Sequence, residues 1–136
     1  MKGQITPYLN FDGRTKEAIE FYKTVLDAKV TVVQTFGEAD YPTPPEADDR
    51  VMHAQLKKGD LSIMFSDTFP GQEVVVGNNI SLTLEPESDE EIQRLYDELS
   101  KHGKQLSELQ DTFWGAKYAR VQDRFGIIWE LNLQKS

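Results

Sequence analysis

Apolar and polar positions alternate at the start of the chain and predict a strand over Ile5 to Phe11, followed by a turn at Asp12-Gly13. Apolar residues then recur at helical spacing from Thr15 to Leu26, with Thr15 as the expected N-cap. Three more strands are predicted, over Lys29 to Phe36, Val51 to Lys57 and Leu61 to Ser66. The first half is therefore predicted to run strand, helix and three strands.

The second half repeats this order. A strand is predicted over Asn79 to Glu85, and Ser88 to Glu91 match a capping box, which indicates a helix start. Apolar residues at helical spacing continue to Leu99, and His102-Gly103 marks the expected helix end. Strands are again predicted, over Gln105 to Leu109, Ala116 to Val121 and Ile127 to Leu133. The pattern indicates a duplicated module.

We therefore expect a single domain of two modules, residues 1–69 and 79–136, with a linker over residues 70–78. The length of 136 residues and the 38% of hydrophobic residues are typical of a folded domain of ordinary size. The chain has no cysteine, which excludes disulfides, thiolate zinc sites and a cysteine nucleophile.

Charge disfavours two classes of partner. Fifteen Lys and Arg stand against 23 Asp and Glu, giving a net charge of −8, and the positive residues are scattered. Binding to nucleic acid or to an anionic membrane is therefore not expected. No segment approaches the ~20 apolar residues of a membrane span, and the N-terminus lacks the apolar stretch of a signal peptide. The expected location is the cytoplasm.

Strand parity divides the strand residues into two rows. The apolar row is expected to pack beneath the helices. The other row mixes amides, hydroxyls and aromatics with one histidine, one arginine and one carboxylate, which is typical of a pocket for a small ligand. Seven of its residues are predicted to face one shared cavity: Tyr8, His53, Gln55, Met64, Asn79, Arg120 and Glu130. The alternative is an ordinary exposed sheet face.

Three residues have competing interpretations. His53 is a candidate acid or base near neutral pH, or a histidine hydrogen-bonded within the sheet. Glu130 is a candidate catalytic carboxylate, or a structural partner of Arg120, because an unpaired carboxylate is costly to bury. Trp114 lies in a loop and is expected either to cover the ligand pocket or to pack against neighbouring residues.

Several segments together are similar to one known family: Pro7 to Phe11, Glu17 to Tyr22, Val51 to Ala54, Ser66-Asp67, Phe113 to Gly115 and Asp123 to Asn132. The chain resembles the PhnB-like branch of the vicinal oxygen chelate superfamily, which includes glyoxalase I, bleomycin-resistance and fosfomycin-resistance proteins and extradiol dioxygenases. The resemblance implies an α+β fold in which two βαβββ modules form an open eight-stranded mixed β half-barrel with the helices outside.

The resemblance also implies where a metal would bind. Metal-using members take ligands from the first, fourth, fifth and eighth strands. These positions carry over to Thr6 or Tyr8, to the vicinity of Met64, to Asn79 and to Glu130. Only Glu130 is an ordinary ligand, so we expect no complete metal site. Some members carry a methyltransferase label, but no Gly-rich loop follows a strand to hold an adenosyl cofactor, and no cofactor is expected.

Three functions remain open. The first is a metal-free protein that binds an unidentified small molecule in the cleft. The second is a metal-dependent lyase, isomerase or dioxygenase that uses Glu130 and His53. The third is a polar face that serves a protein partner. Because open sheets leave edges that need covering, and proteins of this fold generally pair, a homodimer is expected.

Overall fold

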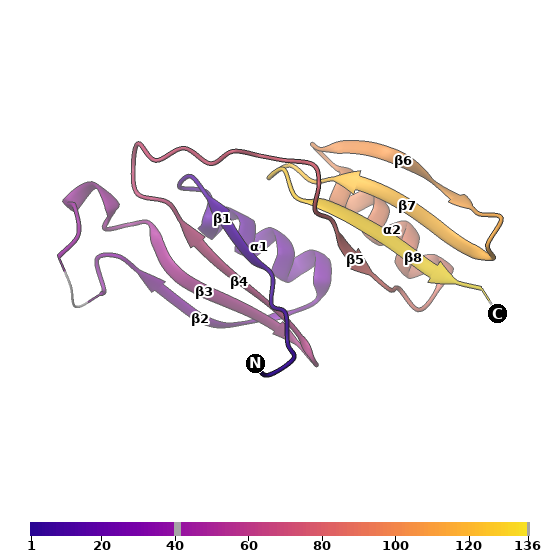
Figure 1. Cartoon of the computed structure of the whole chain (residues 1–136), viewed down its shortest axis with the longest axis horizontal. Coiled ribbons are helices and arrows are strands. Elements are labelled where there is room, and N and C mark those ends of the chain that lie inside the picture. The colour runs from indigo at the N-terminus through magenta and orange to yellow at the C-terminus, as the bar shows by residue number, and fades with distance from the viewer. Residues whose placement is uncertain (40–41, 136) are drawn as a thin grey trace. The chain divides into compact units, whose positions relative to one another are not determined.

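The computed structural model describes residues 1–39 and 42–135, and the chain divides into two compact units, Met1–Val75 and Val76–Ser136. The first unit holds β1 (Tyr8–Phe11), α1 (Thr15–Leu26), β2 (Lys29–Thr35), β3 (Val51–Lys58) and β4 (Leu61–Asp67), as Figure 1 shows. The second unit holds β5 (Leu82–Leu84), α2 (Asp89–Ser100), β6 (Lys104–Asp111), β7 (Ala116–Gln122) and β8 (Ile128–Gln134). A short 3-10 helix, Pro45–Ala47, lies in the loop between β2 and β3, where Asp40 and Tyr41 fall outside the described residues.

Both units have the same sheet topology. The strand orders are β1-β4-β3-β2 and β5-β8-β7-β6, with the first strand parallel to its neighbour and the other pairs antiparallel. Each unit is thus a βαβββ module with a four-stranded mixed sheet. The predicted α+β fold of two such modules is confirmed.

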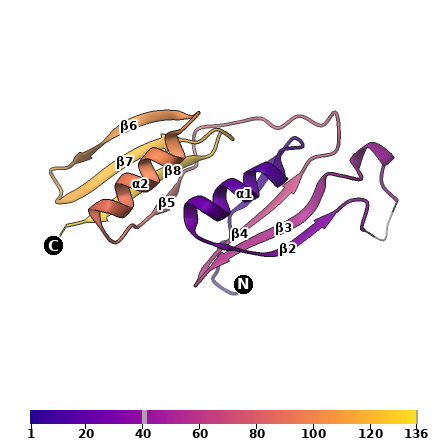
Figure 2. The same ribbon diagram turned by 180° about the vertical axis from the view of Figure 1, so that it is seen from behind.

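In the first module, α1 covers one face of the sheet (Figure 2). Tyr22 is fully buried, and its ring stacks on that of Phe65 in β4 with centroids 5.9 Å apart. Ala18 and Val25 of the helix and Leu56 of β3 are also buried. The apolar stripe of the helix therefore meets the apolar row of the sheet, as the periodicity predicts.

In the second module, α2 packs on β7 and β8 in the same way. Ile92 and Leu99 of the helix are fully buried, as are Val121 and Leu131 of the two strands. The predicted N-cap is confirmed, because the Glu91 N–H donates to Ser88 Oγ at 3.1 Å.

The N-cap predicted for α1 is wrong. Arg14 occupies the cap position, and Thr15 is the first helical residue and fully buried. The Thr15 backbone N–H and hydroxyl both donate to Asp67 Oδ1, at 3.0 and 2.7 Å. The carboxylate at the end of β4 therefore supplies the acceptor that an N-cap side chain normally provides.

Two strands are shorter than predicted. The strands predicted to begin at Ile5 and Asn79 begin later, because Ile5 and Ile80 are 92% and 77% exposed and lie before β1 and β5. Pro7 has no N–H with which to continue the ladder of β1. Leu82 is the register partner of Trp129 and β8 begins at Ile128, so residues before Ser81 have no strand opposite them.

Val51 lies on the opposite face from the one that parity predicts. It is fully buried, as is Ala54. The β2–β3 ladder passes from Gln34↔His53 to Thr35↔Val51, so one residue of β3 is bulged. A bulge shifts the alternation by one residue, which places Val51 on the helix side while His53 keeps the opposite side.

A buried carboxylate also organises the turn between β7 and β8. Asp123 Oδ1 accepts the N–H groups of Phe125 and Ile127 at 2.8 and 3.1 Å. Asp123 Oδ2 accepts the indole N–H of Trp129 at 2.8 Å. This aspartate therefore fixes both the turn and the largest side chain of the second core.

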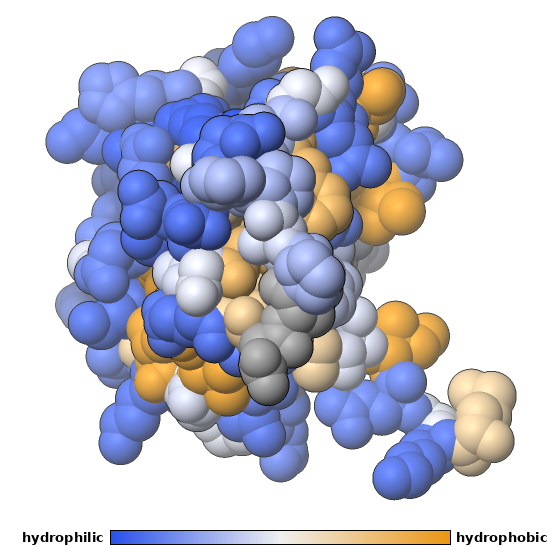
Figure 3. Space-filling model, turned by 90° about the vertical axis from the view of Figure 1, so that its left-hand side faces the viewer, coloured by the Kyte–Doolittle hydropathy of each residue, from blue (hydrophilic) through white to orange (hydrophobic). Residues whose placement is uncertain are grey.

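The surface has two further features. Hydrophilic side chains dominate the face drawn in Figure 3, with apolar ones between them, in keeping with the net charge of −8. Neither α1 nor α2, the α-helices of the part of the chain described here, is long and apolar enough to cross a membrane.

We predict that Asp67→Asn lowers the free energy of unfolding by about 3 kcal/mol, because a buried carboxylate that accepts three hydrogen bonds would be replaced by a group that accepts fewer. Urea unfolding measures the change. Asp60→Asn, in the exposed β3–β4 turn, is the control and is expected to stay within about 0.5 kcal/mol. Equal stabilities for the two variants would contradict the role given to Asp67.

Candidate functional site

The face of each sheet that its helix leaves uncovered is polar and half-buried. The half-buried residues on these faces are His53, Gln55, Ser62, Met64 and Ser66 in the first module and Tyr118, Arg120, Glu130 and Asn132 in the second. A fully solvated sheet face would expose such groups freely. Each face is therefore a candidate ligand surface of its own module.

In the first module the structure brings Tyr8 and His53 together. The Tyr8 hydroxyl lies 3.0 Å from His53 Nδ1, and the ring centroids are 5.9 Å apart. In the sheet order, β4 lies between β1 and β3, so the Tyr8 ring reaches across β4 to the histidine. The hydrogen bond orients the imidazole and leaves Nε2 for another partner.

Gln55 and Met64 lie next to this pair on the same face. They are register partners on β3 and β4, and Met64 is also the register partner of Tyr8 on β1. Gln55 Nε2 donates to Ser62 Oγ at 3.0 Å. Four of the predicted site residues thus form one continuous patch of the first module.

In the second module Glu130 is the centre of a hydrogen-bonded cluster. The Tyr118 hydroxyl donates to Glu130 Oε1 at 2.8 Å, and Arg120 NH1 donates to the same oxygen at 3.3 Å. The Thr83 hydroxyl lies 3.4 Å from Glu130 Oε2. The side chains of Arg120 and Glu130 are 33% and 26% exposed, so this ion pair is partly open to solvent. The structural partner predicted for Glu130 is present.

Burial and the neighbouring carboxylate raise the pKa of Tyr118. Burial is the largest cause, followed by the hydrogen bond to Glu130 and the negative charge of that residue, while Arg120 acts in the opposite direction. Tyr118 therefore remains a protonated hydrogen-bond donor throughout the neutral pH range.

Aromatic side chains extend the cluster towards the β6–β7 turn. Trp114 lies edge-on to Tyr118 with ring centroids 5.9 Å apart, and Phe113 lies edge-on to Trp114 at 5.1 Å. Trp114 is 50% exposed and Phe113 is 97% exposed. Trp114 thus contacts the polar cluster and still offers open ring surface.

Sequence reasoning missed two members of the Glu130 cluster, Tyr118 and Thr83. Both belong to the polar row, and Tyr118 stands two residues before Arg120, so parity alone placed it on the right face. Asn79, a predicted site residue, is exposed and precedes β5, outside the ladder.

The donor set does not match a metal site. Within residues 1–39 and 42–135, no three His, Asp or Glu side chains lie close enough together to hold a metal ion. Glu130 Oε1 already accepts from the Arg120 guanidinium, and that positive charge opposes a bound cation.

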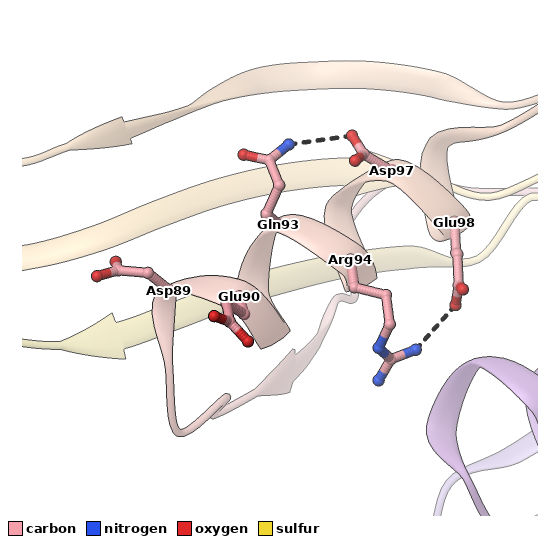
Figure 4. A pocket seen from close by; sticks show the side chains of 6 residues that line it. All are labelled: Asp89, Glu90, Gln93, Arg94, Asp97 and Glu98. Carbon is pink, nitrogen blue, oxygen red and sulfur yellow. Dashed lines mark hydrogen bonds and ion pairs between the residues drawn. The ribbon is translucent and has the colours of Figure 1, made fainter.

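A shallow depression along α2 is lined by charged and amide side chains of the helix, not by residues of a sheet face (Figure 4). All six of its lining residues come from this one helix: Asp89, Glu90, Gln93, Arg94, Asp97 and Glu98. Gln93 bonds Asp97 and Arg94 bonds Glu98, as pairs four residues apart on a helix surface do. This is an ordinary solvated helix face.

Two mixed sheets built from repeated βαβββ modules, each with an uncovered polar face, are a fold that this chain shares with solved structures of low sequence identity. A glyoxylase/bleomycin resistance protein/dioxygenase domain from Frankia sp. EAN1pec has the same fold, with a TM-score of 0.71 at 18% identity over 100% of this chain and 94% of that one. The chain belongs to the family described as 3-demethylubiquinone-9 3-methyltransferase, whose model matches residues 3–132. It is a PhnB-like member of that family.

Relatives match over nearly the full length. Protein YjdN of Escherichia coli K12 is 30% identical over 96% of this chain and 95% of its own. The crystal structure of protein PA1353 from Pseudomonas aeruginosa has a TM-score of 0.87 at 34% identity, covering 98% of both chains. A PhnB protein from Bacillus cereus has a TM-score of 0.83 at 25% identity, covering 96% of this chain and 98% of that one.

We predict that Glu130→Gln lowers the pKa of Tyr118 towards its ordinary value of about 10, because the negative charge beside the phenol is removed while its burial remains. The raised folded-state pKa contributes stability that is present below the unfolded pKa and is lost as pH rises through the folded one. In the variant this loss is smaller and is complete at a lower pH, because only the folded-state pKa changes. Carbon-13 NMR of the tyrosine rings follows the titration, and an unchanged Tyr118 curve would contradict the cluster.

Proposed function

We propose that this protein binds a small molecule through the uncovered polar faces of its sheets. The observation that carries the proposal is the Glu130 cluster, in which Tyr118 and Arg120 hold a half-buried carboxylate on a face that no helix covers. Ligand sites typically combine a few oriented polar groups with aromatic surface. Trp114 supplies that aromatic surface beside the cluster.

Hydrogen bonds within the cluster orient the Glu130 carboxylate before any ligand binds. Glu130 Oε1 accepts two donors, whereas among the described residues Oε2 has only the long contact to Thr83, so Oε2 is the oxygen best able to accept from a ligand. Because its neighbours already fix the carboxylate, little side-chain entropy is lost on binding. These features support a specific polar contact.

The first module supplies a second set of contacts. Tyr8 is 44% exposed and holds His53 through Nδ1, which leaves the phenol ring and Nε2 available to a ligand. The prediction that His53 and Glu130 face one shared cavity stays a prediction. A double-mutant cycle tests it, since residues that contact one ligand show coupled effects on its affinity.

The family description implies a methyl donor, and the residues do not fit an adenosyl cofactor. Gly13, in the turn before α1, lies 3.3 Å from the Arg50 guanidinium at the point where a side chain would begin, so the turn is already filled. At the start of α1 the Thr15 N–H already donates to the Asp67 carboxylate, and at the start of α2 Ser88 accepts the Glu91 N–H as the N-cap. Neither helix start offers the open Gly-rich cradle that such a cofactor uses, and we derive no methyl transfer.

An enzyme of the same superfamily is the second candidate function. Glu130 would be its one ordinary metal ligand, and His53 its acid or base. Metal analysis after mild purification tests this candidate. A stoichiometric divalent metal that is lost in Glu130→Gln would favour a metal-dependent lyase, isomerase or dioxygenase over the binding protein.

We predict that Glu130→Gln and His53→Ala each weaken the binding of compounds found by thermal-shift screening of a small-molecule library. The melting temperature of the free protein should stay within a few degrees, because a loss of ~1 kcal/mol has about that effect in a domain of this size. Isothermal titration calorimetry measures the affinity.

Asp97→Asn, on the outer side of α2, is the matched control and should bind these compounds as the unchanged protein does. Compounds whose affinity is the same in all three variants would contradict the proposal. A large fall in melting temperature for Glu130→Gln would instead make its pairing with Arg120 structural.

We also propose a homodimer. Each sheet has a long outer strand, β2 or β6, and Val32, Val33 and Leu106 on these strands are 40%, 45% and 46% exposed. Exposed apolar edge strands favour association. Light scattering at micromolar concentration is expected to give about twice the chain mass of 15.5 kDa, and a mass of one chain would refute the dimer.

A further inference from the structure

A groove of about 500 Å³ crosses the polar face of the first module. Its lining includes Lys2, Thr6, Gln55, Lys57, Asp60 and Ser62. Gln55 and Lys57 of β3 and Ser62 of β4 lie on the face that α1 leaves uncovered, and Lys2 and Thr6 come from the segment before β1. The groove therefore continues the patch that holds Tyr8 and His53.

Its charge is opposite to that of the whole chain. Neither Lys2 nor Lys57 has an ion-pair partner among residues 1–39 and 42–135, and Asp60 is the single carboxylate of the lining. Lys29 on β2 is the direct register partner of Lys57. Like charges opposite one another on neighbouring strands destabilise a sheet, and a bound anion would offset that repulsion.

Hydrogen bonds beside these lysines leave a donor in the groove. The Thr31 hydroxyl donates to Gln55 Oε1 at 3.2 Å, and Gln55 Nε2 donates to Ser62 Oγ at 3.0 Å. The oxygen of Ser62 thus accepts, and its hydroxyl hydrogen remains to be donated. Ser62 is the register partner of Lys57 on β4, so the two side chains leave neighbouring strands side by side and both line the groove.

We propose that this groove binds an oxyanion, a carboxylate or a phosphate, carried by the small-molecule ligand. The inference rests on the proposed function and names the chemistry of one end of the ligand. Lys57 supplies the charge and Ser62 a hydrogen bond to the anion. Lys57 and His53 are four residues apart on β3, so the anionic group lies roughly 13 Å along the strand from the Tyr8–His53 pair.

Nitrogen-15 NMR of the full chain tests the groove with two probes, inorganic phosphate and acetate, at constant ionic strength. We expect saturable shifts of the Gln55, Lys57 and Ser62 amides with at least one probe, and the tighter probe identifies the class of anion. Lys57→Gln should weaken this binding about fivefold, since one charge contact in solvent is lost.

Lys58→Gln is the matched control, because Lys58 is the next residue of the strand, points to the helix side and donates to the Leu26 carbonyl. It should leave the anion affinity unchanged. Lys57 is exposed and opposes Lys29, so Lys57→Gln should fold at least as well as the unchanged chain. The absence of saturable shifts, or equal affinities in Lys57→Gln and the unchanged chain, overturns the inference.

The result also separates this inference from the proposed function. Library compounds that lose affinity in Glu130→Gln but not in Lys57→Gln would uphold small-molecule binding and overturn the anionic end. Anion binding that depends on Lys57, with no compound that depends on Glu130 or His53, would uphold the groove and overturn the function proposed for the Glu130 cluster.

Discussion

One helix covers one face of each four-stranded sheet, and this one-sided burial determines the rest of the structure. In the first module Tyr22 of α1 stacks on Phe65, and in the second Ile92 and Leu99 are buried where α2 packs on β7 and β8. Because side chains alternate across a strand, every residue packed beneath a helix leaves its neighbours on the opposite face. That opposite face carries the polar groups in both modules.

Buried carboxylates keep these faces in register. Asp67 links the start of α1 to β4 and accepts the Val51 N–H of β3, and Asp123 links the β7–β8 turn to the ring of Trp129. A shift of one residue in either place would turn the polar row towards the helix. The position of His53 and the position of Glu130 therefore both depend on a buried aspartate elsewhere in the same module.

The sequence predicted the elements well because periodicity and capping are local signals. Both helices lie where helical spacing placed them, and the Ser88 cap has the expected hydrogen bond. The errors arose where contacts between residues far apart in the sequence determine the local structure. The acceptor expected from Thr15 is supplied by the Asp67 carboxylate, which is 52 residues away. A bulge in β3 places Val51 on the helix side of the sheet. Neither effect has a signature in the neighbouring residues.

The sequence predicted which face of each sheet carries the candidate site, but not the hydrogen bonds between its side chains. Parity placed Tyr8 with His53, and Arg120 with Glu130, on polar faces, yet the choice of hydrogen-bond partners depends on side-chain reach. Tyr118, which the sequence reasoning left out of the site, makes the shortest bond to Glu130. Asn79 was included because the strand was expected to begin there, and β5 begins only at Leu82.

Amide shift mapping with a compound from the library screen tests the central claim most directly, since it locates the ligand on a face of the sheet. We predict that the largest shifts fall on β7 and β8 around Tyr118, Arg120 and Glu130, with little change along the outer side of α2. Shifts confined to the helices, with those strands unchanged, would contradict the claim that the uncovered polar face binds the ligand.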